Sequence, residues 1–111
     1  MLIGPLPAAS NRATWIENFE FRDQTDDSLI DFSVAEEITL TIRDPNTKAE
    51  LIRLTKTGGG ITTPAAGVIS ARAEVGTMQG LDPKTYEITM EVLDEGDTVQ
   101  MMLGTLPVLG W

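Results

Sequence analysis

The strongest constraint on the fold of this chain is a strict alternation of apolar and polar side chains between residues 85 and 92. Threonine and glutamate occupy every second position, and the positions between them hold Tyr86, Ile88, Met90 and Val92. Successive side chains of a β-strand point to opposite faces, so a period of two is typical of a strand that buries one face. Turn-forming residues lie on both sides of the segment. It therefore predicts a half-buried β-strand.

The same period recurs less strictly in five other segments, and a short apolar stretch adds one more candidate strand. The alternating segments span residues 15–22, 37–44, 49–56, 67–75 and 99–107, and the apolar stretch spans residues 29–34. In the last alternating segment, we expect one face to carry Val99, Met101 and Leu103, and the other to carry Gln100 and Met102. No amphipathic helix of useful length is present, so the pattern predicts an all-β fold, an antiparallel β-sandwich of about seven short strands.

The first 14 residues differ from the rest, because Pro5 and Pro7 flank Leu6 and proline lacks the N–H that a helix or a central strand requires. We expect an extended N-terminal arm at residues 1–14 and one sandwich domain at residues 15–111, a usual size for a single core.

Both chain ends are apolar, and exposed apolar segments usually mark contacts with other molecules. The candidate partner-docking residues are therefore Leu2, Ile3, Pro5, Leu6, Pro7, Leu106, Val108, Leu109 and Trp111. Trp111 either closes one end of the sandwich or docks on a neighbouring molecule.

The charge balance restricts the partners. The chain has 17 acidic and 8 basic residues, a net charge of −9, which repels phosphate backbones and anionic lipid surfaces. The N-terminus lacks the basic start and continuous apolar run of a signal peptide, and no stretch approaches the ~18 apolar residues that cross a bilayer. We expect a soluble protein, made in the cytoplasm, with neither nucleic acid nor membrane as a partner.

The acidic stretch from Asp23 to Asp31 invites a calcium interpretation, because carboxylate oxygens are the ligands that Ca²⁺ prefers. A calcium loop that begins at Asp23 needs glycine at its sixth position and glutamate at its twelfth, where this chain has Ser28 and Val34. The stretch is better interpreted as a solvated loop, and calcium binding there stays open.

Other chemistry finds little support in the residue types. The chain has no cysteine and no histidine, which removes thiolate metal sites and the commonest general base. Lys56 lies beside the glycines at 58–60, but no helix follows them as it would in a phosphate-binding loop. The serines lie in no recognisable nucleophile motif. We expect no enzymatic activity, no metal and no cofactor.

The order of segments resembles a known family. The stretches that carry the resemblance are SLIDFSVAEEITLTIRDP, GGGITTPAAGVISARAEV and LDPKTYEITMEVLDEGDTVQMMLGTLPVLG. Together they are similar to the small Ig-like virion proteins of tailed bacteriophages and to the N-terminal domain of phage baseplate upper proteins. The resemblance implies an Ig-like β-sandwich that occurs in the virion and is synthesised in the cytoplasm of a bacterial host.

The resemblance also implies a role. Its members are structural proteins of the tail, the baseplate or the fibre attachment, or adaptors, and they contact other virion proteins in symmetric multi-copy assemblies. Two alternatives remain, a decoration protein of the phage capsid and an Ig-like module that binds carbohydrate or a cell-surface ligand. The chain lacks the long extension of baseplate upper proteins, which favours a separate adaptor or decoration subunit.

Overall fold

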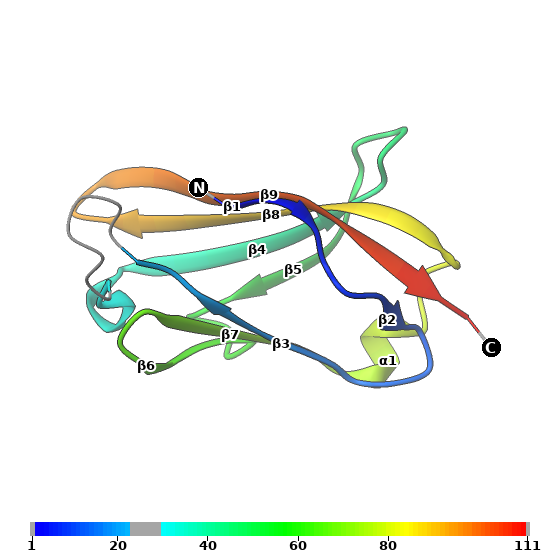
Figure 1. The fold of residues 1–111 in the computed structure, drawn as a ribbon, viewed down its shortest axis with the longest axis horizontal. Coiled ribbons are helices and arrows are strands. Elements are labelled where there is room, and N and C mark those ends of the chain that lie inside the picture. The colour runs from blue at the N-terminus through cyan, green and yellow to red at the C-terminus, as the bar shows by residue number, and fades with distance from the viewer. Residues whose placement is uncertain (1, 23–29, 111) are drawn as a thin grey trace.

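A computed structural model describes residues 2–22 and 30–110, with Leu2 and Ile3 described by their backbone alone. Two sheets form a sandwich, and they are visible in Figure 1 as an upper and a lower layer. The larger sheet contains β1 (Leu2–Pro5), β2 (Ala9–Ser10), β4 (Glu37–Arg43), β5 (Glu50–Thr55), β8 (Lys84–Asp94) and β9 (Asp97–Leu109). The smaller sheet contains β3 (Trp15–Glu20), β6 (Ile61–Ala65) and β7 (Val68–Ala73). The prediction of an all-β sandwich is confirmed.

The strand order in the larger sheet is β1-β9-β8-β4-β5, with β2 also on β9, and in the smaller sheet it is β3-β7-β6. Two short helices, η1 (Phe32–Val34) and α1 (Val75–Met78), connect strands at the sandwich ends. Strands β6 and β7 contact β4 and β5. Only residues 11–14 separate β2, which pairs with β9, from β3, so β3 begins on the side of the sandwich formed by β8 and β9.

The N-terminal residues run along the edge of the larger sheet. β1 and β2 both pair with β9 in the parallel direction, whereas the other strand pairs of the described chain are antiparallel. The prediction of a purely antiparallel sandwich is therefore wrong for this edge. Proline is tolerated there, because an edge strand can leave backbone positions unpaired.

The last two strands are longer than the predicted short strands, since β8 has 11 residues and β9 has 13. A two-residue turn joins them at Glu95 and Gly96, both with positive φ, of 52° and 83°. Two consecutive residues in this conformation form the type I′ turn, whose twist matches that of the strands it connects. A single tight hairpin thus runs through most of the 42 Å length of the molecule.

One register shift reverses the predicted faces of β9. Met102 lies opposite Met90, but Gln100 lies opposite Glu91, so Met101 is an extra residue in β9. An extra residue of this kind, a β-bulge, turns the following side chains to the opposite face. Met102 is consequently buried, while Leu103 is 41% exposed.

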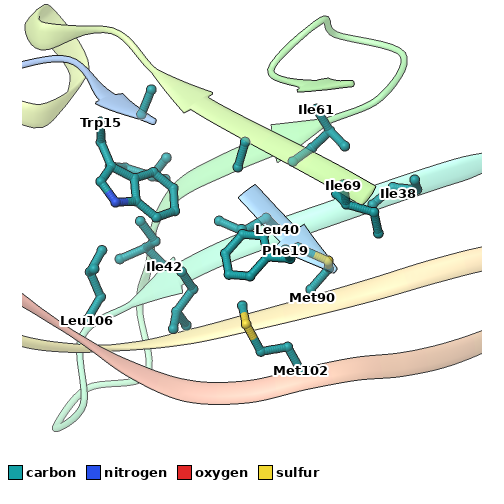
Figure 2. Packing of buried hydrophobic residues seen from close by; sticks show 14 of the residues in the cluster. Trp15, Phe19, Ile38, Leu40, Ile42, Ile61, Ile69, Met90, Met102 and Leu106 are labelled. Carbon is teal, nitrogen blue, oxygen red and sulfur yellow. The ribbon is translucent and has the colours of Figure 1, made fainter. Parts of the chain in front are cut away.

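The core lies between the two sheets and takes buried side chains from β2 to β9. Figure 2 shows Trp15 and Phe19 of β3 packed over Leu40, Ile42, Met90 and Leu106 of the larger sheet. The alternation predicted for β4, β7 and β8 is present in their burial: every second residue is buried or nearly so. Strand β6 has no counterpart among the predicted strands, because Pro64 interrupts it and its register with β7 shifts after Thr62.

Candidate docking surfaces

The predicted docking residues at the N-terminal end lie along β9. The backbones of Leu2 and Ile3 pair with Met102 and Leu103. Pro5 and Pro7 are exposed, whereas Leu6 is partly buried against the core and donates its N–H to the carbonyl oxygen of Thr105 at 2.9 Å. Ala9, which was not predicted as a contact residue, is buried in the same core.

The predicted docking residues at the C-terminal end divide into two groups. Leu106 and Val108 are fully buried in the core, with 0% and 2% exposure, so their side chains are unable to contact a partner. Both positions continue the buried face that Met102 begins, which explains their burial. Leu109 is 39% exposed, and Trp111 lies outside the described residues.

A shallow hollow opens on the outer face of the larger sheet where β1 meets β9. Its volume is about 370 Å³, and its lining comes from Gly4, Pro5, Glu87, Leu103, Gly104 and Thr105. Glycine at 104 is required by the close approach of β1, because a Cβ atom at this position would overlap the carbonyl oxygen of Gly4. The exposed Leu103 side chain gives the hollow an apolar wall that sequence reasoning missed.

Two ion pairs tie the turn between β4 and β5 to β8, beside this hollow. Lys48 donates to both carboxylate oxygens of Glu87 at 2.7 and 2.8 Å. Lys84 donates to Asp44, whose other oxygen accepts the backbone N–H groups of Asn46 and Thr47. These hydrogen bonds, with the one from Lys84 foremost, lower the pKa of Asp44 to about 2.

Tyr86 anchors the start of β8. Its side chain is buried, and its hydroxyl donates to the carbonyl oxygen of Asp82, four residues earlier, at 2.7 Å. Burial raises the pKa of the phenol, and the Lys84 ammonium lies 5.3 Å from the ring centroid. The hydrogen bond fixes the turn that precedes the strand.

Most of the predicted acidic loop lies outside the described residues, which include only Ile30 and Asp31 of it. Asp31 accepts hydrogen bonds from the backbone N–H and the hydroxyl of Ser33, at 3.0 and 2.6 Å, and these bonds lower its pKa. Asp31 therefore caps η1. Within 2–22 and 30–110, no group of three or more acidic side chains is arranged to hold a metal ion.

Lys56, which lies beside the glycines at 58–60, binds backbone carbonyl groups of this chain. Its ammonium donates to the carbonyl oxygens of Ser33 and Ala35 at 2.9 and 2.8 Å. Lys56 thereby holds the end of η1 against the loop between β5 and β6. The glycines that follow form this loop, with Gly59 at a positive φ of 88°.

The aromatic side chains of the described residues are all buried. They are Trp15, Phe19, Phe21, Phe32 and Tyr86. An exposed aromatic platform of the kind that stacks on sugar rings is therefore missing from this part of the chain. No helix in the same part is long and apolar enough to cross a membrane.

The comparisons with known proteins show the fold alone. No protein-family model matches the chain, and no curated protein matches it. The chain is similar to a solved structure described as the endo-β-1,4-mannanase from Thermotoga petrophila, with a TM-score of 0.58 and 12% sequence identity. The likeness covers 94% of this chain but only 18% of the mannanase chain.

This likeness corrects one expectation. The sequence predicts a protein without enzymatic activity, whereas the matched structure belongs to an enzyme. The fold of this chain therefore gives no ground for excluding catalysis, and the expectation is withdrawn. At 12% identity the likeness carries no catalytic residue over to this chain.

Proposed function

We propose that this chain is a structural protein of a tailed-phage virion, in the tail, the baseplate or the fibre attachment, that acts through repeated contacts with other virion proteins. The observation that carries the proposal is the exposed apolar side chains on the outer face of β9, beside the hollow. Two of the six exposed large apolar side chains of the described residues, Leu103 and Leu109, lie on this outer face of β9. In a symmetric particle each copy repeats the same contact, so a modest surface is sufficient.

The proposed fold is Ig-like, in line with the family resemblance of the sequence. The two packed sheets of mainly antiparallel strands support it. The hydrogen bond from the Tyr86 hydroxyl to the Asp82 carbonyl supports it as well, because Ig-like sandwiches anchor this corner with a tyrosine.

The virion role is tested by mass spectrometry of purified particles from a host that carries the gene. We expect the chain in a fixed, multi-copy ratio to the other virion proteins. Cryo-electron microscopy of the same particles then separates a tail position from a decoration site on the capsid. Absence of the chain from intact particles would contradict the proposal.

The contact surface is tested with a charge placed in the hollow. Leu103→Asp should reduce incorporation into particles while the melting temperature of the isolated domain changes little, because the side chain is exposed. Val34→Asp is the matched control, since Val34 is also exposed but lies on η1. Equal incorporation of the two variants would exclude Leu103 from the contact.

A second candidate function is binding of a mannan-type polysaccharide, which the likeness to part of a mannanase favours. The buried aromatic residues weigh against it. Retention of the purified chain on insoluble mannan, released by soluble oligosaccharide, would support this candidate. Passage through the matrix without delay would count against it.

A further inference from the structure

Within residues 2–22 and 30–110, strand β3 has a row of backbone groups without partners along its outer edge. The N–H of Arg72 in β7 donates to the carbonyl oxygen of Gly60, the residue before β6. Backbone groups alternate in direction along a strand, so Ala73, Ala71 and Ile69 direct theirs toward β3. They lie opposite Trp15, Glu17 and Phe19.

The intervening residues of β3 therefore direct their backbone groups away from the sheet. They are Ile16, Asn18 and Glu20, and β3 is the outermost strand of its sheet. Phe21 continues the alternation, because its N–H points back toward β7 and donates to the carbonyl oxygen of Gly67 at 2.7 Å. Six hydrogen-bonding groups in register, which have no partner among the described residues, are therefore available to an added strand.

The other three edges of the sandwich carry features that discourage strand addition. β1 and β2 are short and separated by Pro7, and β6 contains Pro64. β5 has a register shift against β4. Proline and bulges are usual means of protecting edges, and β3 has neither proline nor a register shift.

Glu17 gives the open edge a charge preference. It lies on the core-facing side of β3 between Trp15 and Phe19 and is only partly buried. A strand added to β3 would place a side chain on the same face beside the Glu17 carboxylate. A second copy of this chain carries a net charge of −9, so it is repelled, whereas a basic strand is attracted.

We propose that the outer edge of β3 binds an extended, lysine- or arginine-bearing strand of another protein by β-strand addition, with Glu17 selecting the basic strand. The backbone of Ile16, Asn18 and Glu20 supplies the hydrogen bonds. The exposed Ile16 side chain supplies an apolar contact on the outer face. The partner is a virion protein if the proposed function is correct, and the binding itself does not depend on that function.

The test uses two synthetic seven-residue peptides, one alternating lysine with valine and one alternating glutamate with valine. Titration of the full chain is followed by the backbone amide signals in NMR. We expect the lysine peptide to shift the amides of Ile16, Asn18 and Glu20 and to slow their hydrogen exchange. The glutamate peptide should bind several-fold more weakly.

Three variants sharpen the test. Asn18→Pro removes a donor that points away from β7, so binding should be lost while the fold is kept. Arg53→Pro is the matched control on β5. The N–H of Lys56 points toward β4, because it donates to the carbonyl oxygen of Ile38. Backbone groups alternate in direction along a strand, so the N–H of Arg53, three residues earlier, points away from β4. Glu17→Gln should reduce the preference for the lysine peptide about two- to fivefold, and Glu17→Lys should reverse it.

The possible outcomes differ clearly. Equal binding of both peptides, or amide shifts on β5 or β1 in place of β3, would overturn the proposal. A concentration-dependent dimer in sedimentation without peptide, abolished by Asn18→Pro, would assign the edge to a second copy and would also overturn it. None of these results bears on the presence of the chain in virions, so the two proposals fail separately.

Discussion

β9 and β3 border the same side of the sandwich, yet the N-terminal residues cover only one of them. Residues 2–10 lie along β9 and seal the edge of the larger sheet, and the chain then crosses to β3 and leaves its edge open. Leu6, Ala9 and the hydrogen bond from the Asn11 N–H to the Leu109 carbonyl hold the cover in place. The covered strand β9 therefore contributes to the stability of the domain, whereas the edge of β3 is free to bind another strand.

The largest effect is expected inside the covered edge. Leu106→Ala should lower the free energy of unfolding by about 2–5 kcal/mol, because it leaves a cavity beneath β9. Leu109→Ala, on the exposed face of the same strand, should change it by less than about 0.5 kcal/mol. Urea denaturation of the two variants checks the contrast. If both variants lost less than about 0.5 kcal/mol of unfolding free energy, Leu106 would not be a core residue.

Deletion of the N-terminal residues that cover β9 is expected to lower the free energy of unfolding less than Leu106→Ala does. Deletion of residues 1–11 removes the partly buried Leu6, the buried Ala9 and the hydrogen bonds to Thr105 and Leu109. The domain should remain folded but lose about 2–4 kcal/mol, as judged by urea denaturation. The exposed Pro7→Ala variant is the control. An unchanged unfolding midpoint would show that the N-terminal residues do not hold β9.

A single methyl group should loosen the same cover. Gly104→Ala places a Cβ atom against the Gly4 carbonyl oxygen, so β1 must move away from β9. We expect a loss of about 1–3 kcal/mol in the free energy of unfolding, typical of overpacking. Gly76→Ala is the control, because nothing lies within 4 Å of an added Cβ there. Equal stability of the two variants would argue against the close approach of β1.

The smallest effect concerns Asp44, in the turn between β4 and β5. Lys84 and the N–H groups of Asn46 and Thr47 lower the pKa of Asp44 from 3.8 to about 2. A carboxylate with a lowered folded-state pKa stabilises the fold above its unfolded pKa, and this stabilisation is lost as the pH falls from about 4 to about 2.

Asp44→Asn should remove this part of the acid dependence. Urea midpoints measured between pH 6 and pH 2 should therefore converge for the two proteins at low pH. The amides of β3 should be unaffected, because the ion pair joins the β4–β5 turn to β8. Parallel pH curves for the two proteins would contradict the lowered pKa.

Much of the fold was predictable because alternation is a local signal. Strands β4, β7 and β8 follow from period two, and the turn after Asp94 follows from its glycine. The faces of β9 were not predictable from that signal, because the bulge at Met101 depends on the pairing with β8. The pairing of the N-terminal residues escaped prediction for a similar reason, since it depends on a strand about 100 residues away in the sequence.

The candidate surfaces were less predictable than the fold. Apolar character alone pointed to Leu106 and Val108, but both continue the buried face of Met102. Extending the predicted alternation would have placed them on the face of Gln100, because the alternation takes no account of the bulge at Met101. The open edge of β3 has no sequence signal of its own, because it results from the chain directing its first residues to β9. Glu17 was visible only as a break in the alternation of that strand.

The central claim, that β9 is covered and β3 is open, is tested most directly by amide hydrogen exchange of the isolated chain. We predict slow exchange at Trp15, Glu17 and Phe19 and fast exchange at Ile16, Asn18 and Glu20, because only the first set faces β7. The amides of Leu103 and Thr105, which face β1, should be slow in the full chain and fast after deletion of residues 1–11. Uniform protection along β3, or fast exchange at Leu103 and Thr105 in the full chain, would contradict the claim.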